Sequence, residues 1–191
     1  MARWQANPQE RLVASALDLF AEKGYENTTV IEIAQRAGLT KSTFFRHFPD
    51  KREVLFGGDA MATLLADAIV AAPAGVAPLD AVAHALDTIG REVFTAGRRG
   101  FAARRSAVIA ATPELQEREA LKALGLTAAI AHALKQRGVP ELEANVAAQL
   151  AALTLKLAYE RWISSTHDEA FSEVAMQALR HVQAATPTQS R

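Results

Sequence analysis

Apolar residues recur at helical spacing along most of this 191-residue chain. Leu12, Ala16, Leu19 and Phe20, for example, follow one another at intervals of four, three and one, which places them on one face of an α-helix. No stretch alternates between apolar and polar residues in the way that favours a β-strand. Alanine and leucine also dominate over the β-branched residues, which favours helix. The pattern predicts an all-α fold.

The first helix is bounded by residues with known preferences for helix ends. Asn7 is a good N-cap, Pro8 suits the first helical position, and Gly24 is typical of a helix end. The apolar stripe between them predicts a scaffold helix. Before it, Arg3 and Trp4 lie on an N-terminal arm, which either reaches DNA or is a mobile terminus.

Two short helices joined by a glycine turn follow, over about residues 29–48. Thr29 with Glu32 three residues later forms a capping-box pattern that begins the helix 30–37. Gly38 can adopt the positive φ that ends it, and Thr40 caps the next helix, 41–48. This order predicts a helix-turn-helix whose second helix enters the major groove of DNA.

Polar residues at the start of that second helix are the candidate base readers. Lys41, Ser42 and Thr43 occupy the tip that meets base edges in this docking geometry. A lysine can donate to guanine, and a threonine methyl can contact thymine. Arg46 and His47 are candidates for bases or phosphates. The alternative for all five is an ordinary solvated polar face.

The next helix is expected to begin at Asp50, with Glu53 completing a third capping box, and to run to about Ala72. Lys51 in its first turn is a candidate phosphate ligand. Gly57-Gly58 lie inside the expected helix, where glycine is unfavourable. Two interpretations stay open: a soft hinge, or tight packing against another backbone.

The rest of the chain is helical and divided by proline and glycine. We expect about nine helices in two domains, a DNA-binding domain at 7–53 and a helical domain at 54–185. The helices expected in the second domain, after the one that ends near Ala72, are 80–96, 101–110, 113–137, 141–165 and 168–184.

Four motifs occur together in order between about Gln9 and Leu55: LFAEKGY, TTV, IA-x-x-AG and HF-x-x-K. In this combination the segment resembles the TetR-type family of bacterial transcriptional regulators. The resemblance implies a homodimer that binds a pseudo-palindromic operator on double-stranded DNA. It also implies a C-terminal pocket whose small-molecule ligand releases the protein from DNA, as for a repressor.

Carried over to this sequence, the resemblance implies that Lys41, Ser42 and Thr43 contact bases. It implies that Phe45, His47, Lys51 and the Thr29 cap contact the phosphate backbone. One departure from the family is that tyrosine is common at the position of Phe45, and phenylalanine has no hydroxyl to donate. The expected DNA-binding residues are therefore Thr29, Lys41, Ser42, Thr43, Phe45, Arg46, His47 and Lys51.

The family's last two helices pair with those of a second subunit, which here implies a homodimer through 141–165 and 168–184. Small residues on the first of them permit close helix approach, although an alanine face can equally pack within one subunit. The effector pocket is expected between about residues 79 and 165, and a largely apolar lining suits an oily ligand. Arg98-Arg99 and Arg104-Arg105 are candidates for attracting an anionic ligand such as an acyl-CoA, unless they are solvated. The candidate lining residues, each of which is alternatively an ordinary core or surface residue, are His84, Thr88, Phe94, Phe101, Thr127, His132, Tyr159 and Trp162.

Composition and missing motifs argue against several other classes of protein. The chain has no cysteine, which excludes disulfides and thiolate metal sites. It has no apolar run of membrane-spanning length and no apolar stretch typical of a signal peptide, so we expect a cytoplasmic protein. Its net charge is zero, and its five histidines lack metal-ligand spacing. No P-loop, HExxH or GxSxG motif is present; we expect no enzyme, cofactor or metal. A ligand-independent DNA-binding protein stays open as the alternative.

Overall fold

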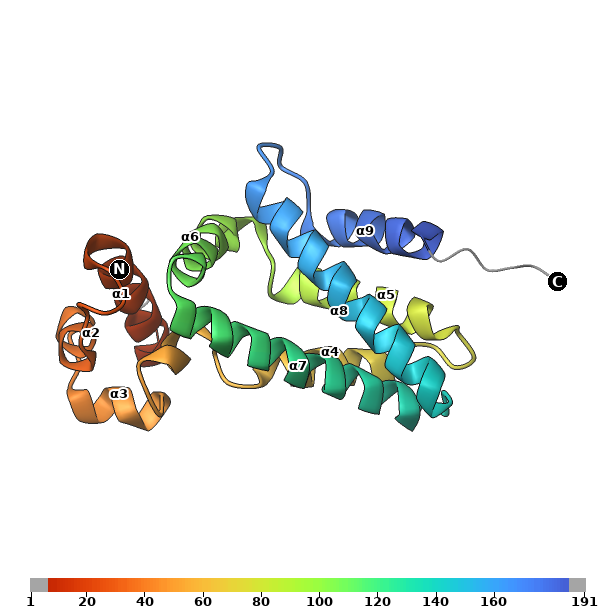
Figure 1. Ribbon diagram of the computed structural model, residues 1–191, viewed down its shortest axis with the longest axis horizontal. Helices are drawn as coiled ribbons and strands as arrows, with labels where there is room; N and C mark the ends of the chain where they lie inside the picture. The colour runs from red at the N-terminus through yellow and green to blue at the C-terminus, as the bar shows by residue number, and fades with distance from the viewer. Residues whose placement is uncertain (1–6, 186–191) are drawn as a thin grey trace, which may run out of the picture. The chain divides into compact units, whose positions relative to one another are not determined.

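The computed structural model describes residues 7–185, and within them every regular element is a helix (Figure 1). The arm that carries Arg3 and Trp4 lies outside these residues. The expectation of an all-α fold is confirmed. In the described part of the chain no helix is long and apolar enough to cross a membrane.

The helices form two compact units. The first unit contains the described residues up to Gly58 together with 104–120, and the second contains 59–103 with the rest of the chain from Leu121. The chain therefore passes between the units at the Gly58–Asp59 junction and again within the helices α6 and α7. The expected boundary after residue 53 stays a prediction.

The first unit is built around a small apolar core under three helices. Leu12, Leu17, Ile33 and Phe44 are fully buried there, so each helix contributes at least one large side chain. The second half of α6 and the start of α7 belong to the same unit. Its elements are α1 (Pro8–Lys23), α2 (Val30–Arg36), α3 (Lys41–His47) and the 3-10 helix η1 (Arg52–Leu55), with parts of α6 (Arg99–Ala110) and α7 (Pro113–Gln136).

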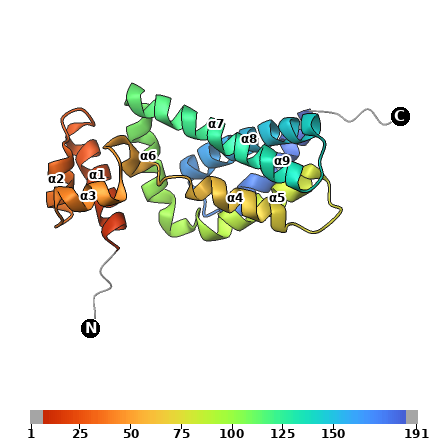
Figure 2. The ribbon, with the colours of Figure 1, turned by 90° about the horizontal axis from the view of Figure 1, so that it is seen from below.

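The second unit is a helical bundle in which α5 packs against both α4 and α9, and α9 packs against α8 (Figures 1 and 2). One close approach depends on Gly90 of α5: a Cβ there would lie 3.0 Å from the backbone nitrogen of Ser172 at the start of α9. Arg137 donates to the carbonyls of Ala72, at 2.7 Å, and of Pro73, at 2.6 Å, and so caps the end of α4. The elements not yet bounded are α4 (Ala60–Ala71), α5 (Pro78–Glu92), the 3-10 helix η2 (Ala96–Arg98), α8 (Glu141–Ser164) and α9 (Phe171–Ala185).

The expected helix from Asp50 to Ala72 is wrong. Asp50 does accept the backbone N–H groups of Arg52 and Glu53, at 2.8 and 3.1 Å, but they begin only the four-residue η1. Gly57 and Gly58 then adopt φ of 65° and 66°, in the left-handed region that breaks a helix. The tight-packing interpretation is also wrong, since no atom lies within 4 Å of a Cβ built at either glycine.

Other helix ends needed smaller corrections. The helix expected at 80–96 is α5, which ends at Glu92, and Ala96 begins η2 instead. The helix expected to be capped by Asp168 begins at Phe171, so Asp168 belongs to the preceding turn. In both places a few residues of the connecting segment were assigned to the neighbouring helix.

Candidate nucleic-acid interface

The reading helix α3 begins with a side-chain cap. The hydroxyl of Thr40 accepts the backbone N–H of Thr43 at 3.1 Å, and the two threonine hydroxyls lie 3.0 Å apart. The Thr43 hydroxyl therefore makes one hydrogen bond within the protein. Lys41 and Ser42 are exposed at the same tip.

One face of α3 is fixed in the core. Phe44 and Phe48 are buried with their ring centroids 5.5 Å apart, as expected for residues four apart on a helix. Phe45 faces outward and is 46% exposed. The ammonium of Lys41 lies 5.8 Å from its ring centroid, within the range of a cation–π interaction. The exposed surface of α3 thus combines a cation and an aromatic ring.

The start of α2 has the predicted capping box. The Thr29 hydroxyl accepts the Glu32 backbone N–H at 3.2 Å, and the Glu32 carboxylate accepts the Thr29 backbone N–H at 2.8 Å. Lys23 also donates to Glu32. These donors, Lys23 first and then Thr29, lower the pKa of Glu32 to about 2. Thr29 therefore caps the helix beside a carboxylate that is ionised at neutral pH.

The turn between α2 and α3 is held by Arg11 of α1. Its guanidinium donates to the carbonyl of Ala37 and lies 3.5 Å from that of Gly38. Gly38 has φ of 65°, and a Cβ there would lie 2.7 Å from Nη2 of Arg11. Glycine is thus required for two reasons: other residues rarely adopt this backbone conformation, and a side chain would collide with Arg11.

Lys51 points into the protein. Its ammonium donates to the carbonyls of Tyr25, at 2.9 Å, and Thr28, at 3.1 Å, and lies 3.9 Å from the centroid of the Tyr25 ring. Two of its three hydrogens are therefore used within the unit. The predicted phosphate contact of Lys51 stays a prediction, and the structure adds an internal role that the sequence did not reveal.

Arg46 and His47 complete the expected set. Arg46 is exposed, and His47 is half-buried. The Nε2 atom of His47 is itself buried and has no hydrogen-bond partner among the described residues. A phosphate that approaches His47 from solvent would therefore meet Nδ1 first, or would require the ring to turn.

A network of charged residues within the first unit links η1 and the start of α7. Glu53 pairs with Arg118, and Arg52 lies 3.6 Å from Glu114. The Tyr25 hydroxyl donates to Glu114 at 3.2 Å. Burial first, and then the Glu114 charge, raises the pKa of Tyr25 above its usual value. Sequence analysis missed this network because its partners lie more than 60 residues apart.

The expected arginine pair on α6 belongs to the same unit. Arg105 donates from Nε to the Leu55 carbonyl at 2.7 Å, and its guanidinium lies 5.0 Å from the Phe56 ring centroid. Arg104 donates to Asp18 of α1 at 3.0 Å. Both arginines are engaged with the protein itself, so their contacts offer no support for a direct role in binding an anionic ligand.

Three of the eight expected effector residues come together in the second unit. Phe94 lies with its ring centroid 5.6 Å from that of Tyr159 and 5.7 Å from that of Trp162. A fourth ring, Phe171 at the start of α9, lies 4.3 Å from Phe94. We call Phe94, Tyr159, Trp162 and Phe171 the aromatic cluster. Sequence analysis missed Phe171 because it restricted the pocket to residues before 166.

The other five expected residues are not members of this cluster. His84 and His132 are exposed. Thr88 and Thr127 donate their hydroxyls to carbonyls one turn earlier in their own helices, at 3.0 and 2.9 Å. Phe101 is half-buried on α6. Their assignment to an effector site stays a prediction.

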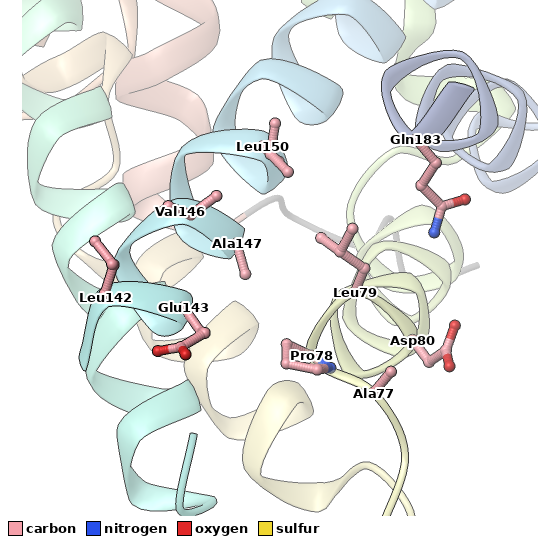
Figure 3. A pocket seen from close by; sticks show the side chains of 10 residues that line it. All are labelled: Ala77, Pro78, Leu79, Asp80, Leu142, Glu143, Val146, Ala147, Leu150 and Gln183. Carbon is pink, nitrogen blue, oxygen red and sulfur yellow. The ribbon is translucent and has the colours of Figure 1, made fainter. Parts of the chain in front are cut away.

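An open groove of about 490 Å³ lies elsewhere in the second unit, between the starts of α5 and α8 and the end of α9 (Figure 3). None of the expected effector residues lines it. Its walls are mainly apolar, with two carboxylates. The lining residues are Ala77, Pro78, Leu79, Asp80, Leu142, Glu143, Val146, Ala147, Leu150 and Gln183.

Large apolar side chains are exposed along α8. Leu142 is 73% exposed, and Val146, Leu153 and Leu157 are each more than two-fifths exposed. Their separations of four, seven and four residues place them on one helix face. Leu142 and Val146 also line the groove. This face is continuous with the groove.

A capped second helix, held by its own aromatic residues and by an arginine across the turn, completes a helix-turn-helix. Residues 12–56 match the family model described as "Bacterial regulatory proteins, tetR family". This likeness to the TetR-type family covers the helix-turn-helix segment of the chain.

Curated relatives match part of the chain. The chain is 41% identical to the HTH-type transcriptional regulator TcmR of Streptomyces glaucescens over 78 residues, which are 40% of this chain and 34% of TcmR. It is 33% identical to the biofilm operon regulator IcaR of Staphylococcus aureus over 46 residues, 24% of this chain and 25% of IcaR. The chain thus spans about a third or less of these relatives' lengths.

Solved structures resemble the whole chain in fold. FadR of Thermus thermophilus, a TetR-family repressor solved with lauroyl-CoA, has a TM-score of 0.55 and 24% identity, and the match covers 96% of this chain and 97% of FadR. SmeT, repressor of a multidrug efflux pump of Stenotrophomonas maltophilia, has a TM-score of 0.57 and 20% identity over 95% of this chain and 91% of SmeT. At these identities the likeness shows the fold alone.

Proposed function

We propose that this protein is a sequence-specific transcriptional regulator, most simply a repressor, that binds a pseudo-palindromic operator as a homodimer and is released by a small, largely apolar effector. The observation that carries the proposal is the exposed start of α3, where Lys41 and Ser42 stand on a helix whose opposite face is buried through Phe44. A rigid helix with a free polar tip suits entry into a major groove.

The expected DNA-binding residues divide into two roles. Lys41, Ser42 and the Thr43 methyl are proposed to read bases, and Arg46 is proposed to meet bases or phosphates. Thr29 and Lys51 already make hydrogen bonds within the unit, so their contribution to DNA binding is partly to hold α2 and α3 in place. Phe45 contributes van der Waals contact and stacking with Lys41 rather than a hydrogen bond to phosphate.

A second copy of the chain is the proposed occupant of the exposed α8 face. Leu142, Val146, Leu153 and Leu157 form an apolar stripe of the kind that marks an interface. Together with α9, this face would give the four-helix contact expected for 141–165 and 168–184. An isologous contact between identical faces closes as a dimer with twofold symmetry, which matches a pseudo-palindromic operator.

The effector is proposed to bind in the second unit. The aromatic cluster supports a ligand with an apolar part, because clustered aromatic rings present apolar surface. A protein that binds DNA without any effector is the alternative. The two differ in one measurement, since only the regulator releases its operator when a small molecule is added.

Selection of binding sites from random DNA tests the proposal. We expect enrichment of a sequence with twofold symmetry, and loss of binding to it when a cognate effector is supplied. The genes beside such sites in the source genome then indicate which compounds to screen. A pool that stays unenriched after repeated rounds would contradict a sequence-specific regulator.

A further inference from the structure

Two buried N–H groups, one in the aromatic cluster and one beside it, have no acceptor within the described residues. They are Nε1 of Trp162, whose side chain is 0% exposed, and Nε of Arg99. Buried donors are satisfied in the great majority of protein structures, and each exception calls for an explanation. Because Arg99 and Trp162 are neighbours, a single acceptor between their side chains could satisfy both N–H groups.

The rest of Arg99 is fixed. Its terminal nitrogens donate to the carbonyls of His167, at 2.7 Å, and Glu169, which lie in the turn before α9. Its guanidinium carbon lies 5.4 Å from the ring centroid of Trp162. These contacts hold Nε beside the indole and leave it as the donor that is still available.

The charge of Arg99 is only weakly balanced by the protein. Its side chain is 17% exposed. The carboxylate that pairs with it, that of Asp168, lies 3.9 Å away on a side chain that is 93% exposed. An exposed pair at this distance stabilises little, because water screens it. An anion that entered beside Arg99 would meet a cation already partly desolvated, where charge-assisted hydrogen bonds are strong.

Apolar surface adjoins these donors. Phe94 contacts the Trp162 and Phe171 rings, at 5.7 and 4.3 Å. Phe94 is half-buried and lies between α5 and η2, outside the helices. Its backbone N–H donates to the Ile89 carbonyl at the end of α5, at 3.0 Å. The Phe94 ring can therefore move aside by rotation of its own side chain, and it is less enclosed than Trp162, which is 0% exposed.

We propose that Arg99 and Trp162 bind the carboxylate of an amphipathic effector, whose apolar part takes the place of the Phe94 ring against Trp162 and Phe171. Arginine Nε and indole Nε1 are donors only, so they require a group that only accepts, and the arginine charge favours an anion. This proposal rests on the proposed function, because it names the ligand class of the effector site. A buried water on the two donors is the competing explanation.

Fluorescence of Trp162 gives a direct test. The chain has two tryptophans, so Trp4→Phe leaves Trp162 as the sole indole. Decanoate, decanol and decylamine are titrated into this protein. We expect a saturable change in Trp162 emission with decanoate and an affinity about tenfold or more lower for decanol and decylamine, the size expected for loss of a charged hydrogen bond. Equal affinities for decanoate and decanol, or no saturable change, would overturn the proposal and favour the water.

Variants of the two donors provide the second measurement. Trp162→Phe keeps an aromatic ring and removes the N–H, and Arg99→Met keeps chain length and removes the charge. Calorimetry should show decanoate binding weakened about tenfold or more in each, with Arg98→Met, an exposed neighbour, as the matched control. Decanoate binding unchanged in both donor variants would overturn the proposal.

Operator binding separates this proposal from the proposed function. A protein that binds its operator and is released by an apolar compound without a carboxylate keeps the regulator role and loses the carboxylate site. A protein that binds decanoate at Trp162 but never a specific DNA keeps the site and loses the regulator role.

Discussion

The ammonium of Lys51 lies 3.9 Å from the Tyr25 ring centroid and donates to the Tyr25 carbonyl at 2.9 Å. Lys51, which follows α3 in the chain, thus holds the loop that leads from α1 into α2. We predict that Lys51→Ala lowers the free energy of unfolding of the DNA-binding unit by about 2 kcal/mol, as for loss of charged hydrogen bonds. It should also weaken DNA binding for all sequences alike.

Denaturant unfolding and the salt dependence of DNA binding distinguish the two roles of Lys51. A phosphate contact predicts that the slope of log K against log salt falls by about one. Lost stability with an unchanged slope would show that Lys51 acts only through Tyr25 and Thr28. Unchanged stability would contradict the internal role.

Lys41 should determine base preference without affecting stability, because it is exposed at the start of α3. We predict that Lys41→Ala costs about 1–3 kcal/mol at one base pair of the operator and relaxes the preference there. Binding to a set of operators with single base changes measures this. Lys156→Ala on α8, also an exposed lysine, is the control. A Lys41→Ala protein with unchanged base preference would contradict the reading role.

The Glu53–Arg118 pair should stabilise the first unit. The Glu53 side chain is 11% exposed, so removal of Arg118 takes away a charged hydrogen bond in a site with little water. We predict that Arg118→Met lowers the free energy of unfolding by about 1–3 kcal/mol, the size expected for loss of a charged hydrogen bond. In the double variant with Glu53→Gln the loss should be less than the sum of the two single losses.

The exposed Arg104–Asp18 pair is the control for that cycle, because both side chains are two-fifths exposed or more. Asp18→Asn should change stability by about 1 kcal/mol at most. Strict additivity of Glu53→Gln and Arg118→Met would show that their contact does not stabilise the unit.

Gly90 should be required for the approach of α5 to α9. A Cβ at Gly90 lies 3.0 Å from a backbone nitrogen, that of Ser172, which cannot rotate away as a side chain can. We predict that Gly90→Ala lowers the melting temperature, with an overpacking cost of about 1–3 kcal/mol. Gly125→Ala on α7, where no atom is near, should instead stabilise by up to about 1 kcal/mol. Equal effects of the two variants would contradict the close approach.

The local signals of the DNA-binding unit were sufficient to predict its elements. Thr29, Gly38 and Thr40 each act on backbone within a few residues, and all three do so in the structure as expected. The helix expected across Gly57-Gly58 was wrong, because both glycines adopt a positive φ that a helix does not accommodate.

Long-range contacts could not be predicted. Lys51 has a basic side chain beside a DNA-binding helix, and nothing in its neighbours in sequence shows that it reaches back to Tyr25. Glu53 and Arg118, or Phe94 and Phe171, likewise meet only after folding. The sequence identified candidate residues by type, and the fold decided which of them share a site.

The central claim is that α3 reads DNA from a twofold symmetric dimer. Footprinting of the protein on its selected operator tests it most directly. We predict two protected half-sites that are related by symmetry and centred about one turn of DNA apart, or a multiple of it. A single asymmetric half-site, protected at saturating protein, would contradict it.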